Sequence, residues 1–96
     1  MTDDRYELAP NVVFTPTGAD ALLLRLDDET VFALNATGAR TVQLAIDGLD
    51  ERTLLQRLAS EYATSPAAIE AETIDLLNAL VAGGLMRRVS TKSIDG

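Results

Sequence analysis

The chain changes its hydrophobic pattern abruptly at Asn35. Before this residue, the stretch TVFAL alternates in the way that is typical of a strand. After it, ATGARTVQLAI carries apolar residues at helical spacing. Asn35 is also a favoured helix N-cap, because its side-chain oxygen accepts a free backbone N–H of the first turn. The small Gly38 allows close approach of other parts of the chain to that turn. The chain is therefore divided into a β-prone front part and a helical rear part.

The front part predicts three short strands joined by turns. They are VVFT (12–15), ALLLRL (21–26) and TVFAL (30–34), and the connectors PTGAD and DDET contain turn-forming residues. Short strands with tight connectors favour an antiparallel meander. The nearly continuous apolar run of the second strand indicates a buried strand. Residues 1–11 are expected to form an N-terminal segment with little regular structure.

The rear part predicts three helices. The first runs from the Asn35 cap to Gly48, and Asp50 caps a second that carries a leucine-rich face up to Tyr62. Ser65 caps the third, with proline at its first helical position, and the Gly83-Gly84 pair ends it. LMRRV (85–89) is expected to pack back onto the body, and residues 90–96 to form a frayed, disordered tail.

Together these elements predict an α+β fold. Three strands expose one apolar face, which three amphipathic helices cover, in the order β-β-β-α-α-α. This order is that of a winged-helix-like domain, expected over residues 12–89. A chain of 96 residues is long enough for one such domain and too short for two.

The composition argues against catalysis and against cofactors. The chain has no histidine and no cysteine, so it lacks the commonest general base and every thiolate ligand. The densest acidic group, Asp27-Asp28-Glu29, lacks the ligand spacing of a calcium loop and is expected to be a solvated turn. We therefore expect a non-enzymatic protein with no cofactor and no metal. Without a signal peptide or an apolar run long enough for a membrane span, we expect it in the cytoplasm.

Three classes of binding protein remain open from the residues alone. A small acidic chain suggests an acyl carrier, but the helix-start position reads IDGLD, without the serine that carries phosphopantetheine. The element order suggests a nucleic-acid binder, but the net charge of −7 repels phosphates, and the third helix has no basic residue. An acidic winged-helix-like module for protein–protein interaction is the third class.

An ordered series of motifs resembles the PqqD-like family. The series begins with Asp27, then Leu34-Asn35 and Gly38, in the pattern D-x6-L-N-x-x-G. Asp47-Gly48 follows about one helix later. A leucine-rich helix ending in Tyr62 comes next, and AAIEAETIDLLNALVAGGLM (67–86) is similar to the last helix of the family and its Gly-Leu end. The resemblance covers residues 11–89.

The resemblance implies a RiPP recognition element, a domain that binds the leader of a ribosomally synthesised precursor peptide. In the family, the leader adds as a strand to the edge of the third strand and lies between that strand and the third helix. This implies the following peptide-binding residues: Thr30, Val31, Phe32, Ala33 and Leu34 on the strand, and Ile74, Leu77, Asn78 and Val81 on the helix.

The chain also departs from the family. Thr41 and Val42 stand where members often have a large apolar or aromatic pair. The first helix is expected to be about a residue longer than in the coenzyme PQQ member, as in the discrete recognition proteins of lasso-peptide pathways. The resemblance thus implies a free-standing adaptor that presents its peptide to a separate peptidase, cyclase or radical enzyme. Its oligomeric state, monomer or strand-swapped dimer, stays open.

Overall fold

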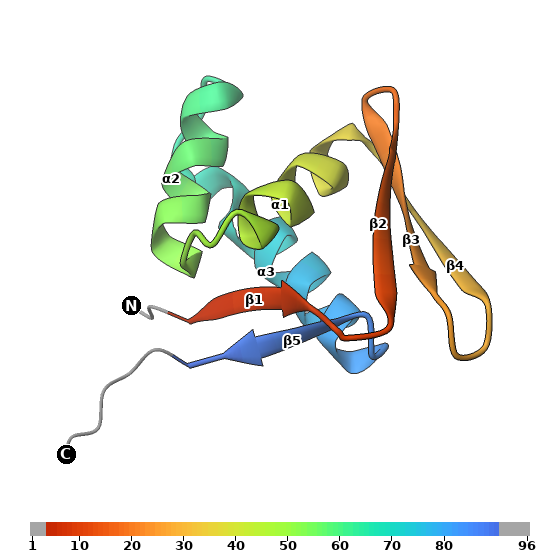
Figure 1. Ribbon diagram of the computed structural model, residues 1–96. Coiled ribbons are helices and arrows are strands. Elements are labelled where there is room, and N and C mark those ends of the chain that lie inside the picture. The colour runs from red at the N-terminus through yellow and green to blue at the C-terminus, as the bar shows by residue number, and fades with distance from the viewer. Residues whose placement is uncertain (1–3, 91–96) are drawn as a thin grey trace, which may run out of the picture.

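The computed structural model describes residues 4–90. The chain runs β1 (Arg5–Leu8), β2 (Val12–Thr17), β3 (Asp20–Arg25), β4 (Thr30–Leu34), α1 (Ala36–Ile46), α2 (Glu51–Glu61), α3 (Pro66–Ala82) and β5 (Met86–Val89). Figure 1 shows the helices on one side of the β2-β3-β4 sheet, with β1 and β5 below α1 and α2. The predicted α+β fold, an antiparallel meander followed by three helices, is confirmed.

The meander is antiparallel throughout, in the order β2-β3-β4. β2 extends to Thr17, two residues beyond the predicted strand, so the turn to β3 consists of Gly18 and Ala19 alone. Alternation along the strands sends one set of side chains toward the helices. Leu23 is completely buried in that set, and Leu34 is nearly so. The core therefore lies between one face of the sheet and the three helices.

All three predicted helix caps are present. Gly38 N donates to Asn35 Oδ1 at 2.9 Å, Thr53 N donates to Asp50 Oδ1 at 2.8 Å, and Ala68 N donates to Ser65 Oγ at 3.3 Å. α3 ends at Gly83-Gly84 as predicted, and the residue with positive φ is Gly84, at 76°. The local signals for helix starts and stops are therefore sufficient to place these helices.

Loss of the Asn35 cap is expected to be measurable. Asn35→Ala removes the acceptor for the Gly38 N–H, and loss of such a cap lowers the free energy of unfolding by about 1 kcal/mol. In a domain of this size, the melting temperature falls by about 4–8 °C. Asn35→Asp keeps an acceptor and serves as the control in thermal unfolding followed by circular dichroism. Equal melting temperatures for the Ala and Asp variants would contradict the role of the cap.

The two ends of the described chain form a second sheet that the sequence pattern does not predict. β1 pairs antiparallel with β5, and Tyr6 of β1 is 1% exposed. Its hydroxyl donates to Glu51 Oε1 at 3.0 Å, and the Arg88 guanidinium lies 5.5 Å from its ring centroid. The N-terminal segment thus carries regular structure, and the predicted range of 12–89 leaves out two core residues, Tyr6 and Ala9. The predicted tail lies outside the described residues, apart from Ser90.

Candidate functional site

β4 forms an edge of the sheet. Its register pairs Thr30 to Leu34 with Arg25 to Ala21 of β3, and among residues 4–90 no strand pairs with its other side. The opposite edge of the same sheet, β2, contains Pro16, which has no N–H to offer an incoming strand. β4 has no proline. The sheet therefore presents one edge that is suited to pairing with a further strand.

The register shows which backbone groups of β4 face this edge. In an antiparallel sheet, successive residues direct their N–H and C=O groups to opposite neighbours. Leu26 N donates to Asn11 O at 2.9 Å. The backbone N–H and C=O groups of the preceding even-numbered residues of β3 therefore point toward β2. The odd-numbered residues of β3 face β4 and pair with Thr30, Phe32 and Leu34. The N–H and C=O groups of Val31 and Ala33 therefore point away from β3, toward the free edge.

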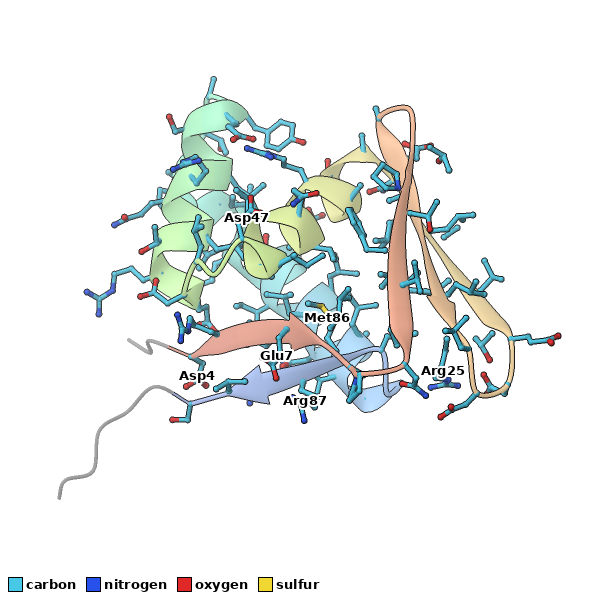
Figure 2. All side chains as sticks on the ribbon, viewed as in Figure 1. Asp4, Glu7, Arg25, Asp47, Met86 and Arg87 are labelled. Carbon is cyan, nitrogen blue, oxygen red and sulfur yellow. The ribbon has the colours of Figure 1, made fainter. Side chains whose placement is uncertain are left out.

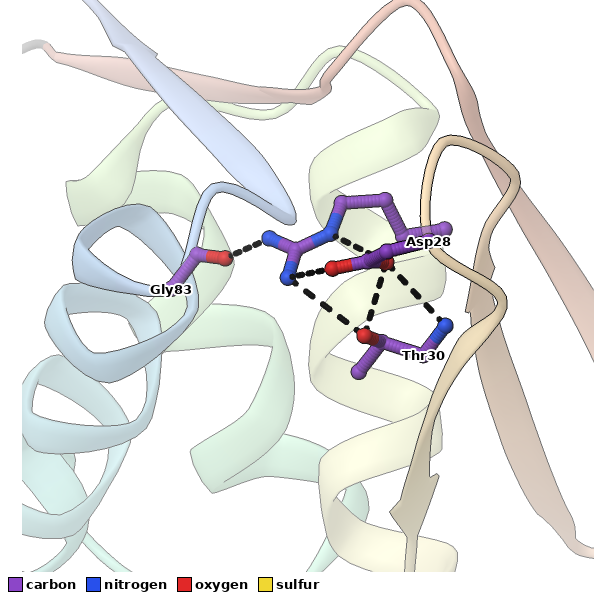
Figure 3. A network of polar contacts seen from close by, with 4 residues as sticks. Asp28, Thr30 and Gly83 are labelled. Atoms are coloured by element: carbon purple, nitrogen blue, oxygen red, sulfur yellow. Dashed lines mark hydrogen bonds and ion pairs between the residues drawn. The ribbon is translucent and has the colours of Figure 1, made fainter.

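An Arg25 network ties one end of β4 to α3 (Figure 3). The guanidinium donates from Nε and Nη2 to the two carboxylate oxygens of Asp28, at 3.1 and 3.0 Å. Its Nη1 donates to the carbonyl oxygen of Gly83 at the C-terminal end of α3. The adjacent Gly84 leaves room for this contact, because a Cβ there would lie 2.9 Å from Nη1. The β3-β4 turn is thus joined to the end of α3.

The strand-to-helix joint brings the other end of β4 and the middle of α3 together at the first turn of α1. A Cβ placed on Gly38 would lie 3.3 Å from Leu34 Cδ2 and 3.5 Å from Leu76 Cδ2. Gly38 therefore lets side chains at the end of β4 and in the middle of α3 close in on the first turn of α1, as its small size predicts. β4 is therefore connected to α3 near both ends, through Arg25 at one end and through the first turn of α1 at the other.

A pocket of about 340 Å³ opens beside this joint. It lies where the start of α1, the end of α2 and the first half of α3 meet. Its lining is mixed apolar and polar, and consists of Asn35, Thr37, Gly38, Thr41, Leu58, Tyr62, Ile69, Glu72, Thr73 and Leu76. Because Asn35 directly follows β4, a chain lying along the free edge has this pocket at its Leu34 end.

The predicted strand residues all lie on β4, but they face different ways. Val31 is 57% exposed and Ala33 is exposed, whereas Phe32 is partly buried against the core and Leu34 is buried. Thr30 Oγ1 donates to Asp28 Oδ1 at 2.7 Å and so belongs to the Arg25 network. The edge contacts that β4 offers are therefore mainly those of its backbone.

The predicted α3 residues lie on a different side of the helix from the pocket. Leu77 is completely buried in the core, and Asn78 Oδ1 accepts a hydrogen bond from Arg88 of β5. Since 3.6 residues make one turn, half-buried Ile74 and Val81 project between Leu77 and Asn78. Leu76, which approaches the Gly38 joint and lines the pocket, lies on the other side of Leu77.

The side of α3 that faces the strand-to-helix joint therefore differs from the side that the family resemblance implies. Leu77 is inaccessible, and Asn78 is directed to β5, so neither is placed to meet a chain on the β4 edge. Ile69, Glu72 and Leu76 line the pocket instead, and the helix ends in Gly83, which receives Arg25. Leu76 belongs to the apolar pattern of the helix, and its contact partners and its partial exposure distinguish it from the core leucines.

The Arg25 network predicts a specific pH dependence. The Arg25 guanidinium, followed by the Thr30 hydroxyl, holds the pKa of the Asp28 carboxyl well below its usual range. In the unfolded chain the carboxyl takes up a proton below about pH 4, whereas in the folded chain it stays ionised to lower pH. This contribution to stability is complete above the unfolded pKa and is lost as the pH falls through the folded one.

Asp28→Asn removes this contribution. We expect stability to fall less steeply on acidification below about pH 5 in the variant than in the wild type, as measured by urea unfolding at a series of pH values. Asp27→Asn, the control, removes the same charge from the same turn and leaves the Arg25–Asp28 hydrogen bonds intact. Identical pH profiles for Asp28→Asn and the wild type would show that the network does not stabilise the fold.

The described residues contain no group of histidine, cysteine, aspartate and glutamate side chains arranged to hold a metal ion. Within the same range, none of the helices has the length and apolar character needed to cross a membrane. The candidate site of the described residues therefore consists of the free edge of β4, the helix α3 beside it and the pocket at the Leu34 end.

Comparison with known protein families identifies one family that matches this chain. The family described as coenzyme PQQ synthesis protein D (PqqD) matches residues 20–86, from the start of β3 to the first residue of β5. This match covers well over half of the chain. The chain belongs to the PqqD family. The resemblance read from Asp27, Leu34-Asn35 and Gly38 is thereby confirmed.

A solved structure shares the fold of this PqqD-family protein. It is described as TbiB1 in complex with the TbiA(beta) leader peptide, and it superposes with a TM-score of 0.79 over 92% of this chain and 99% of the other. The two sequences are 24% identical. A search of the curated proteins gives no match. The fold is therefore similar to that of TbiB1, and the similarity extends over more of the chain than the family match does.

Proposed function

We propose that this PqqD-family protein is a non-catalytic adaptor that binds the leader region of a ribosomally synthesised precursor peptide in the cytoplasm. The observation that carries the proposal is the free edge of β4, where the backbone groups of Val31 and Ala33 point away from the sheet. An extended peptide pairs with such an edge through main-chain hydrogen bonds. The similar fold of TbiB1, a protein solved with a leader peptide, supports the same use of the fold.

The peptide adds as a strand along Thr30 to Leu34. The backbone of Val31 and Ala33 supplies the hydrogen bonds, so affinity depends little on the side chains of the edge. Selectivity comes from the pocket at the Leu34 end, which takes a side chain of the peptide between α1, α2 and α3. Of the helix residues, Leu76 replaces Leu77 and Asn78 as the principal contact, while Ile74 and Val81 lie on the side toward β5.

The adaptor acts by bringing peptide and enzyme together. A peptide held on β4 is at a high local concentration for any enzyme that binds the same domain, without a catalytic group in the domain itself. The enzyme is a separate peptidase, cyclase or radical enzyme, and the setting is a lasso-peptide pathway, as the resemblance to the discrete recognition proteins of such pathways implies. The Arg25 network and the Gly38 joint contribute by holding β4 in place for the incoming strand.

Calorimetric titration tests this function. The protein is titrated with a synthetic leader from a precursor gene adjacent to its own, and with a scrambled leader of identical composition. We expect a dissociation constant in the micromolar range or below for the leader, and no heat of binding for the scrambled peptide. Equal binding of both peptides, or binding of neither, would refute the proposal.

The charge of the chain predicts that the complex is sensitive to salt. With a net charge of −7 and Glu72 at the pocket, the protein attracts a peptide with basic residues. Raising the ionic strength from about 0.05 to about 0.5 M shortens the Debye length and weakens the complex several-fold. Glu72→Gln is expected to reduce this dependence. Titrations that give the same affinity at both ionic strengths would remove charge from the account of binding.

A further inference from the structure

The outer face of the β2-β3-β4 sheet, turned away from the helices, carries a cluster of apolar side chains. Since side chains alternate, the residues between the core-facing positions lie on this face. The apolar residues among them are Val13, Leu22, Leu24, Val31 and Ala33, beside the polar Thr15, Thr17 and Asp20, and the exposed Leu26 follows β3 in the turn. We refer to the five apolar strand residues and Leu26 as the outer patch. Figures 1 and 2 show no helix or strand of the described chain on this side of the sheet.

The register joins these side chains into one surface. Val13 pairs with Leu24, and Leu24 pairs with Val31, so the three form a row across all three strands. Cross-strand neighbours of this kind lie in contact. Val13 is 42% exposed, Leu26 is 55% exposed and Val31 is 57% exposed. Single exposed apolar residues are common, but a contiguous apolar patch marks an interaction surface.

The sequence of β3 points the same way. The run ALLLRL is nearly continuous in apolar residues, a pattern that belongs to strands covered on both faces. In the described chain the helices cover one face of β3, toward which Ala21 and Leu23 are buried. Leu22 and Leu24, on the other face, are only partly buried and have no layer above them. The composition of the strand therefore fits a sheet that a second body covers.

The charges around the outer patch indicate which kind of partner protein covers it. The β3-β4 turn at one end of the sheet carries Asp27, Asp28 and Glu29, and the β2-β3 turn at the other end is followed by Asp20. Both ends of the patch are therefore acidic. A second copy packed face to face aligns its sheet within about 30° and brings acidic turns together in either orientation. A different protein, with an apolar surface bordered by Lys and Arg, complements the patch.

We propose that the outer patch is the docking surface for the modifying enzyme that receives the peptide. This inference rests on the proposed function and adds to it the location of the second partner. The peptide occupies the β4 edge, and the enzyme occupies the face of the same sheet. The two sites adjoin at Val31 and Ala33, whose side chains belong to the patch while their backbone groups belong to the edge. One small sheet thus holds substrate and enzyme side by side.

Two variants test the outer patch. Val13→Lys places a positive charge in the patch on β2, the strand farthest from the β4 edge, and Leu26→Lys does so in a turn outside the strands. Gln56→Lys on the exposed surface of α2 is the matched control. Each peptidase, cyclase or other modifying enzyme encoded beside this chain is purified singly and titrated against the four proteins. Leader binding and sedimentation are measured in parallel, and thermal unfolding confirms that each variant is folded.

We expect one of these enzymes to bind the wild type and the Gln56→Lys control equally. Binding to the Val13→Lys and Leu26→Lys variants falls at least about tenfold, as for loss of a central interface contact, while leader affinity stays within about twofold. All four proteins are expected to sediment as monomers.

Other outcomes overturn the inference, and they are distinguishable from failure of the proposed function. Leader binding without enzyme binding, or enzyme binding unchanged in both patch variants, refutes the outer patch alone. A wild-type dimer that the Lys variants dissociate assigns the patch to a second copy. Loss of leader binding in Val13→Lys makes the patch part of the peptide site. Failure of the wild type to bind any leader refutes the proposed function itself.

Discussion

Replacing Ala33 by proline is expected to weaken leader binding strongly while leaving the domain folded. The N–H of Ala33 points to the free edge of β4, so the substitution takes no hydrogen bond from the β3-β4 ladder. It removes a donor to the incoming strand and places a ring where that strand lies. One lost hydrogen bond corresponds to about 1 kcal/mol, and the steric conflict adds to it, so we expect affinity to fall by more than about tenfold.

A control substitution at Ala33 separates the contribution of the backbone N–H from that of the side chain. Ala33→Ser keeps the N–H and is expected to bind the leader with nearly wild-type affinity. Pro16 on β2 shows that this sheet already accommodates proline at the opposite edge. Calorimetry gives the affinities, and far-ultraviolet circular dichroism confirms the fold. A folded Ala33→Pro variant that binds the leader normally would exclude strand addition at this position.

Two neighbouring leucines of α3 are expected to have opposite effects. Leu77 is completely buried, and truncation of such a side chain to alanine costs about 2–5 kcal/mol of unfolding free energy. This is a large part of the total stability of a small domain. Leu76 is half-buried at the pocket, so Leu76→Ala is expected to cost less stability and to weaken leader binding several-fold. The folded fraction of Leu77→Ala keeps its affinity for the leader.

Urea unfolding and calorimetry, applied to both variants, measure the two effects. The substitutions are chemically identical and lie one residue apart on the same helix, so each is the control for the other. If Leu77→Ala weakens leader binding more than Leu76→Ala at equal folded fraction, the face of α3 described above is incorrect. Leu77 would then be a peptide contact, as the family resemblance implies.

The elements of the fold that rest on local signals are predictable from the sequence. Asn35, Asp50 and Ser65 each combine a capping side chain with a following amphipathic run, and each cap forms as expected. The β1-β5 pair rests instead on two four-residue strands at opposite ends of the chain. Neither RYEL nor MRRV has a pattern strong enough to identify a strand without its partner, so this sheet emerges only from the structure.

The candidate site also has one part that the sequence predicts and one part that it does not. β4 follows from its alternating pattern and its position last in the meander, which makes it an edge. The side of α3 that faces the site cannot be predicted in this way, because apolar residues cover much of the circumference of this helix. They include Ile69, Ile74, Leu76, Leu77 and Val81. The orientation of α3 is decided by packing against α2, β5 and α1, and therefore by contacts such as that of Asn78 with Arg88. Long-range pairing of this kind leaves no local trace in the sequence.

Hydrogen exchange of the individual backbone amides, followed by nuclear magnetic resonance, tests strand addition most directly. Spectra are recorded for the free protein and for the protein saturated with the leader from the adjacent precursor gene. The account predicts that the amides of Val31 and Ala33, which face the free edge, become strongly protected when the leader binds. Those of Phe32 and Leu34 already bond to β3 and change little. Saturation with leader that leaves Val31 and Ala33 exchanging at their free rates would contradict the account.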